Sequence, residues 1–246
     1  MTLPFTLLQI SDCHLLADAR GEYRGQHPDD GLERLIPAMR AFKANGLVLT
    51  GDVAEDGSAE AYHRAVEYLG DLAPKRAVIP GNHDEPGLMS QVFSAAGFDQ
   101  CRVCQWGGWA IALIDSTIAN DPAGAVSPDE YQVLAQAQAL GLPTVVLIHH
   151  PPVSVGSPWI DRYALKDPED FIEALDPATV KAVGFGHVHQ VYSEHRRGIQ
   201  FLSAPASSVN AQPEMARFTP DPTGPKARWY RLWPDGRWAT GIISAG

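Results

Sequence analysis

Histidine, aspartate and asparagine side chains are concentrated in five short motifs, and each motif follows an apolar run. The motifs are Asp12-Cys13-His14, Gly51-Asp52, Gly81-Asn82-His83-Asp84, His149-His150 and Gly186-His187-Val188-His189. They hold six of the nine histidines in the chain. Imidazole, carboxylate and amide groups together suit a divalent metal such as Zn, Mn or Fe. The motifs therefore predict a metal site.

Two of the motifs place their donors two residues apart. In an extended strand, residues i and i+2 point to the same side. We therefore expect Asp12 and His14 to share a face, and the same holds for the two histidines of the last motif. Cys13 and Val188 would then point into the core, so we do not expect Cys13 to bind metal. The five motifs offer more donors than one ion can use, which indicates two ions with one carboxylate between them.

Each motif also has an ordinary structural interpretation. A Gly-Asp pair is common in turns, an Asn-His-Asp segment can cap a helix, and adjacent histidines can pack in a core. These ordinary uses would have to coincide after five separate apolar runs, so one shared site is the simpler interpretation. His27, His63 and His195 lie outside the motifs, and we expect them to face solvent.

The elements that must position these motifs follow from hydrophobic periodicity. Apolar runs between turn residues predict strands at residues 5–10, 47–50, 77–79, 110–114, 144–148, 182–185, 199–203, 228–233 and 238–243. Helical spacing and capping residues predict helices at 30–44, 58–69, 85–96, about 127–140 and about 167–175. Ligands of open α/β sheets bind at the carboxyl ends of strands, where all five motifs are expected. Glycine precedes the polar group in three motifs, which permits sharp turns and close approach of the backbone.

The order of the elements indicates the fold class. Strands and helices alternate to about residue 185, and strands dominate after it. This order predicts an α/β domain with mixed sheets, whose C-terminal strands are antiparallel. Residues 203–226 are rich in Pro, Ser and Ala, and we expect them to form a long ordered loop. We expect residues 1–246 to form a single domain.

The chain is acidic, with a formal net charge of −10. Non-specific binding of nucleic-acid polymers relies on Lys and Arg, so this charge argues against such a partner. A small phosphate ester stays compatible, because bound metal ions would supply local positive charge. No apolar run reaches the roughly 18 residues of a membrane-spanning helix, and the N-terminal segment lacks the basic region of a signal peptide. We therefore expect no membrane partner.

The three cysteines are Cys13, Cys101 and Cys104. This low, odd number argues against a disulfide framework and favours a reducing, cytoplasmic compartment. The Cys101-Arg102-Val103-Cys104 segment has the spacing of a redox motif. It does not open a βα unit, however, so we expect two thiols on a short strand, buried or half-buried.

In their order along the chain, the five motifs resemble those of the calcineurin-type metallophosphoesterases, which are D-x-H, G-D, G-N-H-[DE], H and G-H-x-H. All five blocks are intact between residues 12 and 189, so the resemblance covers most of the chain. It implies an α/β sandwich of two mixed β-sheets flanked by helices. It also implies two divalent metal ions, which could be Fe, Mn or Zn.

The resemblance implies a role for each matching residue. Six residues would bind the two ions in groups of three, namely Asp12, His14 and His189 for the first ion and Asn82, His149 and His187 for the second. Asp52 would bridge both ions. His83 would be a catalytic histidine that binds no metal, and Asp84 would orient its ring.

A narrower resemblance concerns the bacterial class III 3′,5′-cyclic-nucleotide phosphodiesterases. It is carried by His149-His150-Pro151-Pro152, the segment Ser157 to Asp167, Leu15-Leu16 with the loop to Gly25, and Ser203 to Ser207. It implies a small phosphodiester substrate, cyclic AMP, which a hydroxide held by the two ions would convert to 5′-AMP. Glycerophosphodiesters and 2′,3′-cyclic nucleotides stay open as substrates, because related glycerophosphodiesterases share some of these segments. A non-catalytic scaffold of the same fold is expected to have lost ligands, and this chain keeps all of them.

Three residues of the Ser157 to Asp167 segment have two interpretations each. Trp159 could stack a nucleobase or pack against its neighbours. Arg162 and Lys166 could contact a phosphate or be solvated. The sequence does not choose between these interpretations.

Overall fold

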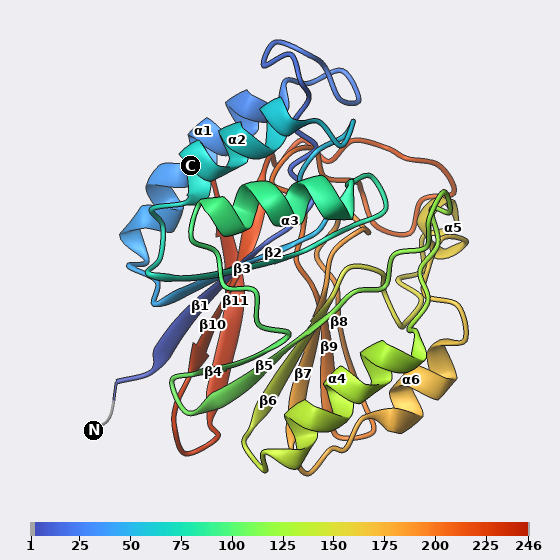
Figure 1. The fold of residues 1–246 in the computed structure, drawn as a ribbon. Coiled ribbons are helices and arrows are strands. Elements are labelled where there is room, and N and C mark those ends of the chain that lie inside the picture. Colours follow the sequence, from blue (N-terminus) through green and yellow to red (C-terminus); the bar gives the residue numbers. More distant parts are fainter. Residues whose placement is uncertain (1–2, 246) are drawn as a thin grey trace.

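Two β-sheets lie face to face, and helices cover the outer side of each sheet (Figure 1). The structure is a computed structural model, and it describes residues 3–245. The first sheet has the strand order β11 (Trp238–Ser244), β10 (Lys226–Leu232), β1 (Phe5–Ile10), β2 (Gly46–Thr50) and β3 (Lys75–Ile79). The second has the order β4 (Val103–Trp106), β5 (Trp109–Ile114), β6 (Thr144–Ile148), β7 (Val180–Phe185), β9 (Ile199–Ser203) and β8 (Ser193–Arg196).

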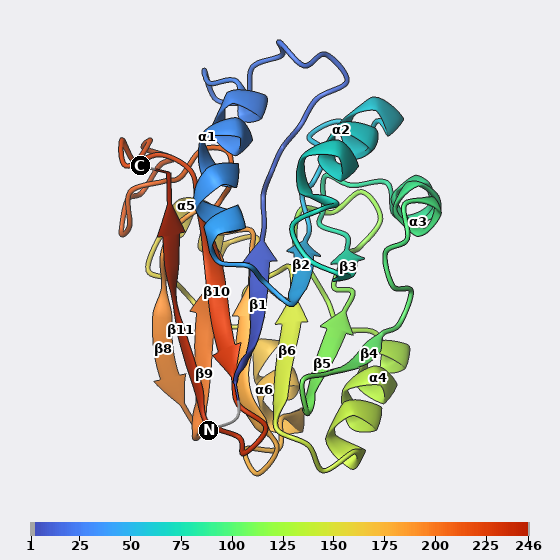
Figure 2. The same ribbon diagram turned by 90° about the vertical axis from the view of Figure 1, so that its left-hand side faces the viewer.

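Both sheets are mixed, as the sequence predicts. Strands β1, β2 and β3 are parallel, and β10 and β11 extend this sheet in antiparallel register. In the second sheet, β5, β6, β7 and β9 are parallel, and the edge strands β4 and β8 are antiparallel to their neighbours. The arrows of β1, β2, β3, β5 and β6 point to the same end of the molecule (Figure 2). The loops that follow these strands therefore meet at one end.

Three apolar layers hold the sandwich together. Helices α1 (Pro28–Ala41), α2 (Ala59–Leu69) and α3 (Pro86–Ala95) pack on the outer face of the first sheet. Helices α4 (Pro128–Ala139), α5 (Pro158–Asp161) and α6 (Pro168–Ala174) pack with the outer face of the second. Side chains such as Leu7, Val48 and Trp109 fill the space between the sheets. The central strands are apolar on both faces because each face lies against one of these layers.

The helices begin where the sequence places capping residues. Ser58 accepts a hydrogen bond from the backbone N–H of Ala61 at the start of α2. Ser127 accepts one from Glu130 in the same way at the start of α4, so the expected capping box places this helix correctly. Helix α1 begins two residues before its expected start, because Pro28 occupies the first helical position, where proline is favoured.

One strand and one helix escape the sequence analysis, and the short strand expected around Cys101 and Cys104 begins only at Val103. Strand β8 has the sequence Ser-Glu-His-Arg and no buried residue, since it lies at the edge of the sheet. Strand β4 is four residues long and is also an edge strand. Helix α5 has four residues, which is too short for a helical period. The expected ordered loop at 203–226 is confirmed, and it joins β9 to β10.

The expectation for the cysteines is wrong in one respect. Cys101 and Cys104 form a disulfide, with their Cα atoms 5.7 Å apart, whereas two free thiols were expected. The chain enters β4 at Val103, and this turn brings the two residues within the range that a disulfide requires. Cys13 is the free cysteine among the described residues, and it is buried. The cysteines therefore give no support to a reducing compartment, and a cytoplasmic location stays a prediction.

Among residues 3–245, no helix combines the length and the apolar composition that crossing a bilayer requires.

Candidate metal centre

The five motifs lie where five parallel strands end. Strand β1 ends at Ile10, β2 at Thr50, β3 at Ile79, β6 at Ile148 and β7 at Phe185, and a motif begins one or two residues later in each case. The first three strands belong to one sheet and the last two belong to the other. Both sheets therefore contribute to one site, and the expected convergence at strand ends is confirmed.

The backbone at this site differs from the extended strand that the spacing of the motifs suggested. Asp12, His14, Asp52, His187 and His189 all have positive φ angles, between 48° and 68°. Such angles are uncommon for residues other than glycine, and they cluster at functional sites. The donors therefore point inward because the loops turn sharply after the strands, and strand alternation is not the reason. Cys13 and Val188 are nevertheless buried, as expected.

The glycines of the motifs allow the backbone to approach the donors. A Cβ atom on Gly81 would lie 2.2 Å from Oδ1 of Asp52. A Cβ atom on Gly186 would lie 2.0 Å from Oγ of Ser11 and 2.9 Å from Oδ2 of Asp12. No side chain fits at such distances, so the close approach that the sequence predicts is confirmed.

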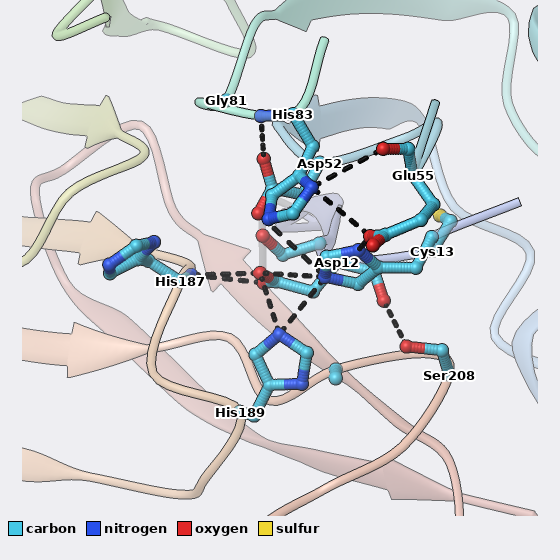
Figure 3. Close-up of polar contacts among 12 residues, drawn as sticks. Asp12, Cys13, Asp52, Glu55, Gly81, His83, His187, His189 and Ser208 are labelled. Carbon is cyan, nitrogen blue, oxygen red and sulfur yellow. Dashed lines mark hydrogen bonds and ion pairs between the residues drawn. The ribbon is translucent and has the colours of Figure 1, made fainter. Parts of the chain in front are cut away.

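One group of donors combines Asp12, His14 and His189, which are all buried. Figure 3 shows the ring of His189 beside the carboxylate of Asp12. Oδ1 of Asp12 lies 3.3 Å from Nε2 of His189, and the two histidine Nε2 atoms are 3.1 Å apart. These donor atoms are close enough to share one ion. The group matches the set expected for the first metal ion.

A second group is marked by buried polar atoms that lack a hydrogen-bond partner. Within the described part of the chain, these atoms include Oδ1 of Asn82, Nε2 of His149 and Nε2 of His187. A buried polar atom without a partner is costly, so such atoms indicate a missing ligand. An amide oxygen and two imidazole nitrogens fit a divalent metal ion. They are also the donors that the family resemblance implies for the second ion.

Asp52 lies between the two groups. Its Oδ2 atom is 3.7 Å from Nε2 of His14 and 3.4 Å from Nε2 of His149. This position suits a carboxylate that bridges two ions. We refer to these seven residues as the donor cluster, which comprises Asp12, His14, Asp52, Asn82, His149, His187 and His189.

Hydrogen bonds to Nδ1 fix the rings of three histidines. Nδ1 of His149 lies 2.7 Å from the carbonyl oxygen of Thr50, and Nδ1 of His189 lies 2.7 Å from that of Val209. Nδ1 of His14 lies 2.7 Å from Oε2 of Glu55. A carbonyl or carboxylate oxygen can only accept, so each Nδ1 carries the proton. The three Nε2 atoms therefore face the other donors and are the atoms that can bind a metal ion.

Burial and neighbouring charge determine the ionisation of the donor cluster. Burial alone would raise the pKa of Asp52, but His149 outweighs it and holds that pKa well below its usual value. Burial lowers the pKa of His149, but Asp52 outweighs this effect and raises it to about 9. Burial also holds the pKa of His187 well below its usual value. The site thus offers an ionised carboxylate and a neutral imidazole, and a bound ion would replace the proton that His149 retains.

The structure places Glu55, and not Asp84, against the ring of His83. Nδ1 of His83 lies 3.1 Å from Oε2 of Glu55, the same oxygen that contacts His14. The carboxylate of Asp84 instead accepts hydrogen bonds from the backbone N–H groups of Val53, Ala54 and Gly81. The expected contact between Asp84 and His83 is therefore wrong. Asp84 holds the loops after β2 and β3 together, and the sequence analysis missed Glu55.

A cavity of about 390 Å³ opens beside the donor cluster. This volume lies in the range of small-ligand pockets. Asn82, His83 and His187 line it on one side. Residues of four further segments line the rest, namely Arg24, Pro122, Trp159, Ile160, Arg162, Tyr163, Ala216, Arg217 and Phe218. The cavity gives a small molecule access to the second group of donors.

The residues that the sequence left undecided now have defined surroundings. Trp159 is 8% exposed and packs edge-on against Phe218, so the packing interpretation is confirmed. Lys166 contacts Oδ2 of Asp121 at 2.6 Å. Arg162 lines the cavity. His27, His63 and His195 are exposed, as expected.

Two further residues contribute to the site, and the sequence analysis assigned a role to neither. Tyr23 stacks on the ring of His14 with a centroid distance of 4.0 Å. Buried His150 lies close to His149 and His187, and its Nδ1 atom is 2.8 Å from Oγ of Ser116. The histidine pair was visible in the sequence, but only the structure shows that both rings face the same group.

Comparison with known proteins agrees with the geometry. Residues 5–191 match the model of the calcineurin-like phosphoesterase family. The chain is 31% identical to the 3′,5′-cyclic adenosine monophosphate phosphodiesterase CpdA of Pseudomonas aeruginosa, over 96% of this chain and 88% of that protein. It is 29% identical to a 3′,5′-cyclic-nucleotide phosphodiesterase of Nostoc sp., over 98% of this chain and 92% of that protein.

The fold also occurs in solved structures of low sequence identity. The crystal structure of a dimetal phosphatase from Danio rerio superposes over the whole of both chains, with a TM-score of 0.68 and 15% identity. The family match covers most of the chain and includes all five motifs. The chain therefore belongs to the calcineurin-like phosphoesterase family.

Proposed function

We propose that the protein is a metal-dependent 3′,5′-cyclic-nucleotide phosphodiesterase that hydrolyses cyclic AMP to 5′-AMP. The observation that carries this proposal is the donor cluster, in which the carboxylate of Asp52 lies between His14 of the first group and His149 of the second. The relatives named above support the choice of substrate, because they match nearly all of this chain. The cavity beside the cluster supports a small-molecule substrate.

In this proposal, Asp12, His14 and His189 would hold one divalent ion, and Asn82, His149 and His187 would hold the other. Asp52 would contribute its carboxylate to both. When bound, the ions would supply a nucleophile at neutral pH and offset the charge on the phosphoryl oxygens. The mixture of imidazole, carboxylate and amide donors suits Fe, Mn or Zn, and metal availability would decide among them.

His83 is the proposed donor of a proton to the leaving oxygen. Its side chain is 36% exposed and lines the cavity, so it can reach a bound substrate. Nδ1 of His83 donates to the backbone carbonyl oxygen of Glu55 at 3.3 Å, which leaves Nε2 for proton transfer. The oxygen of water forms a bond to phosphorus, and the bond from phosphorus to the ribose 3′-oxygen breaks. Protonation of that oxygen completes 5′-AMP.

An assay of the purified protein with Mn²⁺, Fe²⁺ or Zn²⁺ tests this proposal. Cyclic AMP is the substrate, and chromatography separates 5′-AMP from 3′-AMP. We expect 5′-AMP as the sole product. His189→Ala should lose most of the activity and bound metal, whereas His63→Ala, which changes an exposed histidine on α2, should keep both.

The failures of this assay are distinguishable. Hydrolysis of bis(4-nitrophenyl) phosphate or of glycerophosphodiesters without hydrolysis of cyclic AMP would refute the substrate but not the chemistry. Absence of bound metal after incubation with all three ions would refute the chemistry and favour a non-catalytic scaffold.

A further inference from the structure

Three arginine side chains from three separate segments line the cavity. Arg24 comes from the loop between β1 and α1, Arg162 follows α5, and Arg217 lies in the loop between β9 and β10. Of the described residues that line this cavity, none is an aspartate or a glutamate. In a chain with a net charge of −10, a cavity lined by three guanidinium groups and no carboxylate is a local reversal of charge. We refer to Arg24, Arg162, Arg217, Trp159 and Phe218 as the arginine wall.

The arginines of the wall keep most of their hydrogen-bond donors available. Within residues 3–245, none of the three forms an ion pair with a carboxylate. Nε of Arg24 donates to the hydroxyl of Tyr23 at 2.9 Å, and Nε of Arg162 donates to the carbonyl of Trp159 at 3.1 Å. These bonds fix the stems and leave the terminal nitrogens free. Asp161, which adjoins Arg162, is turned away and accepts from Ser154 and Val155.

Aromatic side chains hold the wall in place. The guanidinium carbon of Arg24 lies 3.9 Å from the ring centroid of Phe218, so the group rests on that ring. The rings of Trp159 and Phe218 pack edge to face at 5.2 Å. The indole N–H of Trp159 is buried and has no hydrogen-bond partner among the described residues. A buried donor without a partner points to an acceptor that the protein itself does not supply.

The cleavage of a simple diester does not require this charge. A phosphodiester carries one negative charge, and two divalent ions beside Asp12 and Asp52 can oppose it. Guanidinium groups are suited to phosphate oxygens, which they bind with two parallel hydrogen bonds. Three unpaired guanidinium groups beside the donor cluster thus match a second anionic group, at some distance from the bond that is cleaved.

We propose that the arginine wall binds a phosphate group additional to the scissile diester, so that the enzyme also hydrolyses nucleotide diesters that carry a further phosphate. This proposal goes beyond cyclic AMP, which has no such group. In the reaction, water adds to the scissile phosphorus, the bond to the leaving oxygen breaks, and that oxygen takes a proton. The additional phosphate is unchanged, and it holds the nucleotide in the cavity.

A matched pair of chromogenic esters tests the proposal. One is the 4-nitrophenyl ester of thymidine 5′-phosphate, and the other is the same ester with a phosphate on the 3′-oxygen. Both have the same scissile bond and release 4-nitrophenolate. We expect kcat/KM to be about tenfold higher for the ester with the additional phosphate, because exposed charge pairs are individually weak but three act together. The preference should decrease as salt is added, since salt screens exposed charges.

Single substitutions connect the preference to the wall. Arg162→Gln and Arg217→Gln should each bring the ratio of the two kcat/KM values closer to one. Arg197→Gln is the matched control, because Arg197 is exposed in the turn between β8 and β9, outside the cavity. This variant should keep the wild-type ratio. Thermal unfolding of each variant checks that the fold is retained.

Three results would overturn the proposal. They are equal rates on the two esters, hydrolysis of neither ester by a preparation that cleaves cyclic AMP, and equal losses on both esters in the arginine variants. The last result would mean that the arginines bind the shared nucleoside. A preference for the phosphorylated ester without hydrolysis of cyclic AMP would instead refute the proposed function alone.

Discussion

The donor cluster and the arginine wall border the same cavity, but they are built in different ways. Six of the seven residues of the donor cluster are buried, and Asn82 is half-buried, whereas all three arginines of the wall are exposed. The donors follow strand ends, and hydrogen bonds to the backbone or to Glu55 fix their rings. The arginines extend from loops, and two of them contact aromatic rings, Arg24 that of Phe218 and Arg162 that of Tyr163. The chemistry of the site is thus tied to the sheets, and the choice of substrate is tied to the loops.

Asp52→Asn should have the largest effect, because it removes the negative charge shared by the two groups of donors. We expect a loss of at least about a thousandfold in kcat, since metal ions contribute several kcal/mol of charge stabilisation in such sites. Metal content should fall in the same variant. Asp71→Asn, an exposed change that affects only a surface contact with Arg40, is the control. Full metal content with normal turnover in Asp52→Asn would show that the cluster does not depend on this carboxylate.

Glu55→Gln tests whether the donor cluster depends on a partly exposed residue. The carboxylate contacts Nδ1 of both His14 and His83, and its side chain is 28% exposed. Changes of this kind of supporting residue typically reduce metal affinity or activity by about 10–100-fold. We expect a loss in this range, visible both in a metal titration by calorimetry and in kcat. An unchanged titration with reduced kcat would indicate that Glu55 acts on His83 alone, and Glu60→Gln on α2 serves as the control.

Phe218→Ala should affect the wall and leave the cluster intact. The ring supports the guanidinium of Arg24, and such a contact contributes about 0.5–1 kcal/mol at an exposed position. We therefore expect KM to rise by roughly two- to fivefold with little change in kcat or metal content. Steady-state kinetics and elemental analysis of the same preparation check both parts. A loss of metal would mean that the two regions are not independent.

Cys13→Ala should have the smallest effect on catalysis, although the residue lies between two proposed ligands. Cys13 is fully buried, and Oγ of Ser207 donates to its sulfur at 3.2 Å. Removal of the sulfur should lower the free energy of unfolding by about 1 kcal/mol, as is common for a buried truncation. Calorimetry would show this as a small decrease in Tm, while metal content and kcat stay unchanged. A decrease in metal content would identify Cys13 as a ligand.

The sequence predicts the donor cluster well because its signals are local. Each donor follows an apolar strand, and glycines such as Gly81 and Gly186 mark the positions where only a bare backbone fits. The two sheets and most helix starts were predictable for the same reason. The backbone conformation of Asp12 and His14 was not, since positive φ angles of non-glycine residues carry no sequence signature.

The arginine wall could not be predicted, because its parts come from distant segments without a shared pattern. Arg24 and Phe218 are almost two hundred positions apart and meet only when two long loops fold over the cavity. Glu55 was missed because a carboxylate three residues after Asp52 is unremarkable in a polar loop. Strand β8 was missed because an edge strand can be polar on both sides.

The hydrogen bonds that the carboxylate of Asp84 accepts have a consequence for how substrate choice can change within the family. By joining the backbone after β2 to that after β3, this carboxylate ties Asp52 and Asn82 to neighbouring strands, which lie about 4.8 Å apart in any sheet. The spacing of the strands, and not the length of any loop, thus sets the distance between Asp52 and Asn82. Insertions in the loops around the cavity can then alter which molecules enter, while the hydrolytic machinery keeps its dimensions.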